Sequence, residues 1–145
     1  MSLKEEDRKV LVMLELEKAE KTLIQLDVQL QAQLWEMAAN RLYYSLFHAV
    51  SALLISDHHE VGTHRGAVNK FSLYYVKEGV FTKEEGRLYS RLQRLREDGD
   101  YNCYLFIFIS NIPLDLLNKL TGGLNLLFHL VLLHIYRTII ITIFA

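Results

Sequence analysis

Arg41 and His48 are the two side chains whose chemistry and spacing first indicate a site. They are seven residues apart in an apolar helical segment, so at about 100° per residue they return to nearly the same side of the helix. Tyr44 falls close to the same stripe. The forked donors of an arginine can hold a phosphate, and a histidine can act as general acid or base towards a 2′-hydroxyl. The pattern predicts a phosphate-binding site, with a polar cluster satisfied internally or across a dimer interface as the alternative.

Two long helical segments must position these residues. Apolar residues recur at three- and four-residue spacing over 4–31 and again over 34–55. One continuous helix would leave its apolar stripe without a partner, so a turn is expected at 28–33. The residues of the second segment expected to face the core are Leu42, Leu46, Ala49, Val50 and Leu53.

Polar breaks delimit a third helix. Residues 57–62 interrupt the periodicity, and Thr63 can cap a helix that runs from His64 to Glu78. Gly79 then closes it.

A capping box opens a fourth helix. Thr82 and Glu85 have the required spacing, and the helix is expected to end near Glu97 because Asp-Gly-Asp follows at 98–100. Four helices with short connections predict an all-α fold, a bundle of four to five helices.

Composition excludes several classes of function. A chain of 145 residues with a net charge of -1 is one domain without the basic field of a general nucleic-acid binder. Its single cysteine, Cys103, excludes a multi-cysteine zinc site. His58, His59 and His64 lie near Glu60 but lack repeated ligand spacing, so we expect neither a metal nor a cofactor. The charged N-terminus is unlike a secretory signal, and we expect a cytoplasmic protein.

The chain changes character near Cys103. Residues 103–145 hold only three charged residues, and 124–145 is long and apolar enough to span a membrane. Arg137 counts against a span, so hydropathy leaves the question open. We therefore divide the chain into a helical domain, 1–102, and an apolar segment, 103–145, which is a last helix, a membrane span or a frameshifted tail.

Three groups of residues, in this order, resemble the HEPN domain family over roughly 14–102. They are Asn40-Arg41-Leu42-Tyr43-Tyr44 with Phe47-His48-Ala49, then Thr63-His64-Arg65-Gly66, then Arg96 with Asp100-Tyr101. The resemblance implies a four- to five-helix bundle, usually dimeric, in a prokaryotic protein often encoded beside a minimal nucleotidyltransferase. In such pairs the HEPN protein is frequently the toxin and the nucleotidyltransferase the antitoxin. Many members are metal-independent ribonucleases with an Arg followed a few residues later by a His, and others bind nucleotide or RNA.

The resemblance implies roles for particular residues. Arg41 and His48 would be the catalytic pair, with His48 as the acid or base. The expected phosphate- or nucleotide-binding set is Arg41, Tyr44, His64, Arg65, Arg96, Asp100 and Tyr101. Solvated helix ends are the alternative for the pair His64 and Arg65 and for the residues from Arg96 to Tyr101.

Two departures from the family pattern leave catalysis open. Nuclease members typically carry the Arg and His on a later helix, whereas no His follows Arg96 closely here. The apolar 103–145 also replaces an acidic amphipathic last helix. We expect a homodimer that binds RNA or a nucleotide, the toxin-like partner of a minimal nucleotidyltransferase; as an enzyme it would be a metal-independent endoribonuclease. The alternatives are a non-catalytic helical interaction module and a small protein tethered to the membrane through 124–145.

Overall fold

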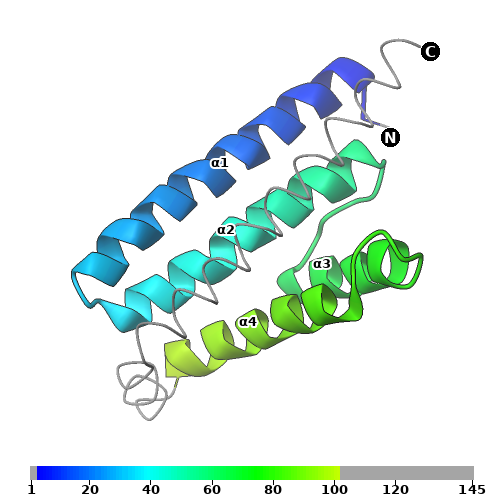
Figure 1. The fold of residues 1–145 in the computed structure, drawn as a ribbon. Helices are drawn as coiled ribbons and strands as arrows, with labels where there is room; N and C mark the ends of the chain where they lie inside the picture. The colour runs from blue at the N-terminus through cyan, green and yellow to red at the C-terminus, as the bar shows by residue number, and fades with distance from the viewer. Residues whose placement is uncertain (1–2, 102–145) are drawn as a thin grey trace.

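The computed structural model describes residues 3–101, which fold entirely into helices and connecting turns (Figure 1). The helices are α1 (Glu5–Gln31), α2 (Trp35–Ser56), α3 (His64–Phe71), the π-helical turn η1 (Ser72–Val76) and α4 (Lys83–Tyr101). In Figure 1, α1 and α2 form a long antiparallel hairpin, and α4 runs along α2 with α3 at one end. The prediction of an all-α bundle is confirmed.

The α1–α2 hairpin places α2 at the centre of the bundle. The turn covers residues 32–34, at the C-terminal end of the predicted range 28–33, and Gln33 in it has a φ of 58°. At the other end of the hairpin, Arg8 Nη1 donates to the carbonyl oxygen of Ile55 over 3.0 Å. The predicted core residues of α2 are all buried: Leu42, Leu46, Ala49, Val50 and Leu53. Because α1 and α4 both pack on α2, polar side chains of α2 can contact either of these helices.

The third helix differs from the prediction in its second half. Thr63 caps it as expected, since its Oγ1 accepts from Gly66 N over 2.9 Å. The α-helix ends at Phe71, however, and widens into η1 instead of continuing to Glu78. The buried Tyr75 anchors this turn, because its hydroxyl donates to Asp57 Oδ2 over 2.7 Å. A long-range contact of this kind leaves no mark on the local periodicity.

The fourth helix begins as predicted and ends later. Thr82 N donates to Glu85 Oε2 over 2.6 Å, and Glu85 N donates to Thr82 Oγ1 over 3.2 Å, which completes the capping box. The expected end near Glu97 is wrong, since α4 continues to Tyr101. A glycine such as Gly99 costs a helix only about 1 kcal/mol, which a helix packed on its neighbours can bear.

The aromatic part of the core lies between α2, α3 and α4. Tyr43, Phe71 and Tyr89 are fully buried, one from each of these helices. Tyr43 stacks on Tyr89 with ring centroids 6.2 Å apart, and Phe71 meets Tyr89 edge-on at 5.6 Å. These contacts fix how α4 lies against α2.

Within 3–101 none of the helices is long and apolar enough to cross a membrane. The apolar segment 103–145, including the candidate span 124–145, lies outside the residues that the structure describes. The proposed division of the chain at residue 102 therefore stays a prediction.

Candidate functional site

Tyr44 is the centre of a cluster in which residues far apart in the sequence meet. Arg96 Nη2 on α4 donates to the Tyr44 hydroxyl over 3.0 Å, across 52 positions of sequence. The Arg96 guanidinium carbon also lies 5.5 Å from the Tyr44 ring centroid, and that of Arg41 lies 5.8 Å from the same centroid. Two arginines from different helices therefore share one tyrosine, as cation–π contacts favour.

We name this group the arginine–histidine cluster and define it by seven residues. They are Arg41, Tyr43, Tyr44, Phe47, His48, His64 and Arg96. Five of them were predicted to act in the site: Arg41, Tyr44, His48, His64 and Arg96. The structure brings these five together from α2, α3 and α4.

A carboxylate on α1 holds His48. His48 Nδ1 lies 2.7 Å from Glu15 Oε2, and Lys18 Nζ donates to Glu15 Oε1 over 2.9 Å. Burial alone raises the pKa of Glu15, but the hydrogen bonds from His48 and Lys18 outweigh it and lower this pKa below its ordinary value. Glu15 is therefore a carboxylate at neutral pH, and it orients the imidazole so that Nε2 is free of this bond.

His64 lies against the rings of α2 instead of at a solvated helix start. Its Nδ1 is 3.0 Å from the Tyr43 hydroxyl, and its ring centroid is 4.3 Å from that of Phe47. Burial, and then the positive charge of Arg96, lowers the pKa of His64 below its ordinary value. The imidazole is therefore neutral at pH 7. Burial also raises the pKa of Tyr43 to about 12, so its hydroxyl keeps its proton.

Arg41 is oriented by neutral groups. Its Nη1 donates to Gln25 Oε1 over 3.2 Å and its Nη2 to Asn40 Oδ1 over 2.9 Å. Amide oxygens fix the direction of the guanidinium without cancelling its charge. Arg41 therefore keeps the positive charge that an anion requires.

The structure does not place the three other predicted binding residues in the cluster. Arg65 is exposed near the start of α3 and makes none of the contacts that build the cluster. Asp100 and Tyr101 lie in the last turn of α4, but their side chains are outside what the structure describes. Binding roles for these three residues stay predictions.

The histidines near Glu60 show no metal geometry in the described range. Between residues 3 and 101, no three of the His, Cys, Asp and Glu side chains are grouped as metal ligands would be. His59 instead stacks on Tyr74, with centroids 3.9 Å apart and planes within 4°. His64 is in the arginine–histidine cluster, away from this pair.

Four contributors were not assigned to the site from the sequence. Tyr43 and Phe47 are one helical turn apart on α2, and that spacing fits core rings equally well. Glu15 and Gln25 are on α1, 33 and 16 residues from the side chains that they hold. No local pattern marks such distant partners, because the α1–α2 packing alone brings them together.

The arrangement suits the binding of an anion. Two guanidinium groups approach Tyr44 from different helices, and two imidazoles lie beside the same ring at centroid distances of 5.6 and 6.2 Å. Arginine forks bind phosphate oxygens in pairs, and a histidine held through Nδ1 can exchange a proton through Nε2. Phosphate binding and a proton transfer are therefore within the chemistry of the cluster.

Comparison with known proteins places the chain in a family. The model of the HEPN domain matches residues 12–107. The chain is 36% identical over 88 residues to a UPF0332 protein of Thermotoga maritima, covering 61% of this chain and 66% of that protein. It is 33% identical over 86 residues to a protein of Methanocaldococcus jannaschii whose name is putative toxin, covering 59% and 64%. The chain spans slightly less than two thirds of the length of either relative. The family match and the helical fold together show that the chain belongs to the HEPN domain family.

Proposed function

We propose that this chain is the toxin-like member of a pair with a minimal nucleotidyltransferase, and that its arginine–histidine cluster binds a nucleotide or RNA phosphate. Two relatives from Methanocaldococcus jannaschii, at 33% and 27% identity, carry the name putative toxin. A homodimer is part of the same proposal. An adjacent reading frame that encodes a minimal nucleotidyltransferase would support the pairing.

The hydrogen bond from Arg96 to Tyr44 is the observation that carries the proposal. It brings a second guanidinium to the Arg41 side of α2 from a helix 52 residues away. Two positive charges near one ring repel each other, and an anion bound between them is attracted by both guanidinium groups. A phosphate fits this role because its oxygens accept from several N–H donors at once.

The cluster also supplies a base for RNA cleavage. With Nδ1 held by Glu15, His48 Nε2 would take the proton of a 2′-hydroxyl, whose oxygen then attacks the adjacent phosphorus. The bond from phosphorus to the 5′-oxygen breaks, and that oxygen takes a proton from water, so the products are a 2′,3′-cyclic phosphate and a 5′-hydroxyl. Arg41 and Arg96 would hold the phosphate oxygens as negative charge develops on them.

His48→Ala tests the chemistry. We expect the wild-type protein to cleave labelled RNA equally with and without EDTA, and the variant to be slower by about 10²–10⁴-fold, the usual contribution of general acid–base catalysis. The exposed His58 is the matched control, and His58→Ala should cleave like wild type. Cleavage is followed by gel electrophoresis of the labelled products.

Each other outcome has a definite meaning. Equal cleavage by wild type and His48→Ala removes His48 from the mechanism. If EDTA stops cleavage, the reaction depends on a metal. If no variant cleaves RNA, the comparison of wild type with Arg41→Gln in nucleotide binding decides whether the cluster is a binding site.

A non-catalytic interaction module is the second candidate. It is favoured by the internal partners of the cluster, because His48, Tyr44 and His64 each have a hydrogen bond within the protein. Buried polar groups with such partners can serve the fold alone. The absence of both RNA cleavage and nucleotide binding in the experiment above would establish this alternative.

A further inference from the structure

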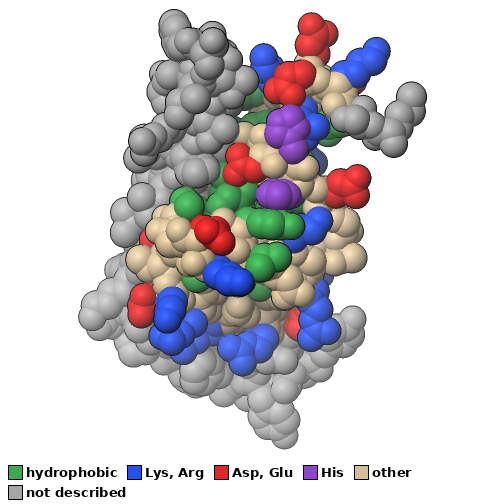
Figure 2. Space-filling view, turned by 90° about the vertical axis from the view of Figure 1, so that its right-hand side faces the viewer, with side chains coloured by type: hydrophobic (Ala, Val, Ile, Leu, Met, Phe, Trp, Pro, Cys, Tyr) green, Lys and Arg blue, Asp and Glu red, His purple; other side chains and the backbone are tan. Residues whose placement is uncertain are grey.

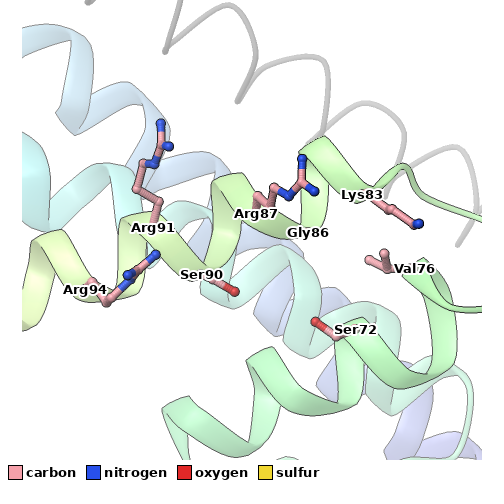
Figure 3. A pocket seen from close by; sticks show the side chains of 8 residues that line it. All are labelled: Ser72, Val76, Lys83, Gly86, Arg87, Ser90, Arg91 and Arg94. Atoms are coloured by element: carbon pink, nitrogen blue, oxygen red, sulfur yellow. The ribbon is translucent and has the colours of Figure 1, made fainter.

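A basic groove lies between η1 and α4, with a volume of about 380 Å³ (Figure 3). We define it by the polar side chains that line it. These are Lys83, Arg87, Arg91 and Arg94, with the hydroxyls of Ser72 and Ser90. No residue of the arginine–histidine cluster is among those that line it, so the groove is a separate feature of the surface.

Gly86 allows the two walls of the groove to approach each other. A Cβ at Gly86 would meet Val76 Cγ2 at 2.9 Å, closer than real Cβ contacts. The buried Gly86 therefore lets the π-helical turn pack directly on α4. Single π-helical turns of this kind are frequently found at functional sites. Direct packing of η1 on α4 therefore sets the shape of the groove.

The groove and the cluster lie on opposite faces of α4. Arg87 and Arg91 precede Arg96 by nine and five residues, which places them roughly 180° and 140° from it around the helix. With side chains, a helix is about 10–12 Å across. A single nucleotide held beside Arg96 would therefore not reach the groove, whereas a polymer could contact both.

The charges of the groove form a line. Successive cations at 83, 87, 91 and 94 are three or four residues apart, or about 4.5–6 Å along the axis. Arg87 has an acidic neighbour, Glu84, at 3.7 Å, but the two side chains are 74% and 78% exposed. Such an exposed ion pair is weak, so another anion can readily replace Glu84 as the partner of Arg87. Figure 2 shows several Lys and Arg side chains in the lower part of the coloured surface, with some Asp and Glu side chains among them.

We infer that the basic groove binds the sugar–phosphate backbone of single-stranded RNA. One line of cations along one helix matches one line of phosphates, and the serine hydroxyls can bond to phosphate or ribose oxygens. An acidic peptide fits less well, because Val76 is the one apolar side chain of the lining and offers no pocket for an anchor residue. The inference rests on the proposed function and specifies RNA as the ligand.

Charge removal in the groove tests the inference. Binding of a labelled single-stranded 2′-O-methyl RNA, which lacks the attacking hydroxyl, is measured by fluorescence anisotropy over a series of salt concentrations. Arg91→Gln with Arg94→Gln should weaken binding about tenfold and reduce the slope of log affinity against log salt by about 1.4, since each phosphate contact on a single strand contributes about 0.7. Affinity for adenosine monophosphate should not change.

The control removes the same charge elsewhere. Lys9 and Lys21 are exposed on α1, and Lys9→Gln with Lys21→Gln should bind RNA with nearly the wild-type slope. Circular dichroism melting of both double variants shows whether they fold.

Failure of the groove and failure of the cluster give different results. If the groove variant binds RNA like wild type, or if wild type binds adenosine monophosphate but no RNA, the groove inference is wrong and the proposed function stands. If a polyglutamate peptide binds as tightly as RNA and the groove variant loses both equally, the groove is a protein-docking site. If the groove variant binds RNA less tightly while Arg41→Gln binds both RNA and adenosine monophosphate like wild type, the groove inference holds and the cluster is not the binding site.

Discussion

Tyr44 connects the two helices that carry the arginines of the cluster. Its hydroxyl accepts from Arg96, and its ring lies beneath both Arg96 and Arg41. The hydroxyl and the ring can be separated by mutation, because phenylalanine keeps the ring and removes the acceptor. Tyr44 is therefore the residue at which the link between α2 and α4 can be measured.

Tyr44→Phe should lower the free energy of unfolding by about 1.5–3 kcal/mol, the usual contribution of a hydrogen bond that involves a charged group. The loss should be seen as a lower urea midpoint at an unchanged slope. Tyr74→Phe is the matched control, because Tyr74 is exposed and stacks on His59 through its ring. Equal stability of Tyr44→Phe and Tyr74→Phe would show that the Arg96 bond adds nothing to folding.

At the residue scale the sequence predicts the contacts that lie along one helix. Helical spacing is enough to place Tyr44 between Arg41 and His48, and the family resemblance adds Arg96. The partners on α1 are Glu15 and Gln25. They could not be predicted, because their contacts depend on the packing of α1 on α2. A polar residue on an amphipathic helix carries no sign of which distant side chain it will meet.

At the scale of elements, the packing of η1 on α4 depends on the small size of Gly86. The nearest atoms of Val76 lie 2.9 and 3.4 Å from where a Cβ would stand. Alanine is a better helix former than glycine by about 1 kcal/mol. The steric conflict opposes this gain, because valine is branched at Cβ and turns away with difficulty.

Gly86→Ala should destabilise the protein by about 1 kcal/mol, because overpacking costs about 1–3 kcal/mol and exceeds the gain in helix propensity. The same change in a Val76→Ala background should be neutral or stabilising. Chemical unfolding of the two single variants and the double variant gives the coupling energy between these positions. A stabilising Gly86→Ala in the wild-type background would show that η1 does not pack on α4 as described.

The starts of the helices are predicted more accurately than their ends. Thr63, Thr82 and Glu85 cap α3 and α4 as their spacing predicts, because a cap is a local hydrogen bond. The change to η1 is accompanied by a tertiary contact, the hydrogen bond from Tyr75 to Asp57. The later end of α4 shows that an Asp-Gly-Asp run shifts the local helix preference by too little to stop a helix by itself.

At the scale of the whole molecule, two partly buried titratable groups, His64 and Glu15, link stability to pH. The folded protein lowers the pKa of His64 below 6.5 and that of Glu15 below 4.5. As the pH falls through the ordinary pKa of each group, the unfolded chain takes up the proton before the folded protein does. The folded state therefore loses stability. Both groups therefore make the protein less stable in acid, in two successive ranges.

The free energy of unfolding should fall below about pH 6.5 and again below about pH 4.5. His64→Gln should flatten the first fall, and Glu15→Gln should flatten the second, because neither glutamine titrates. Urea unfolding at a series of pH values measures both. His59→Gln is the control, and a fall that persists unchanged in His64→Gln would assign the first range to another group.

The long sequence separation between Tyr44 and Arg96 also sets an order of assembly during synthesis. Chains emerge from the ribosome N-terminus first, so the α1–α2 hairpin, with Arg41, His48 and Glu15, exists before α4 has been made. The second guanidinium arrives only when α4 docks. A nascent or prematurely terminated chain that ends before α4 therefore carries every residue of the cluster except Arg96 and none of the basic groove's cations.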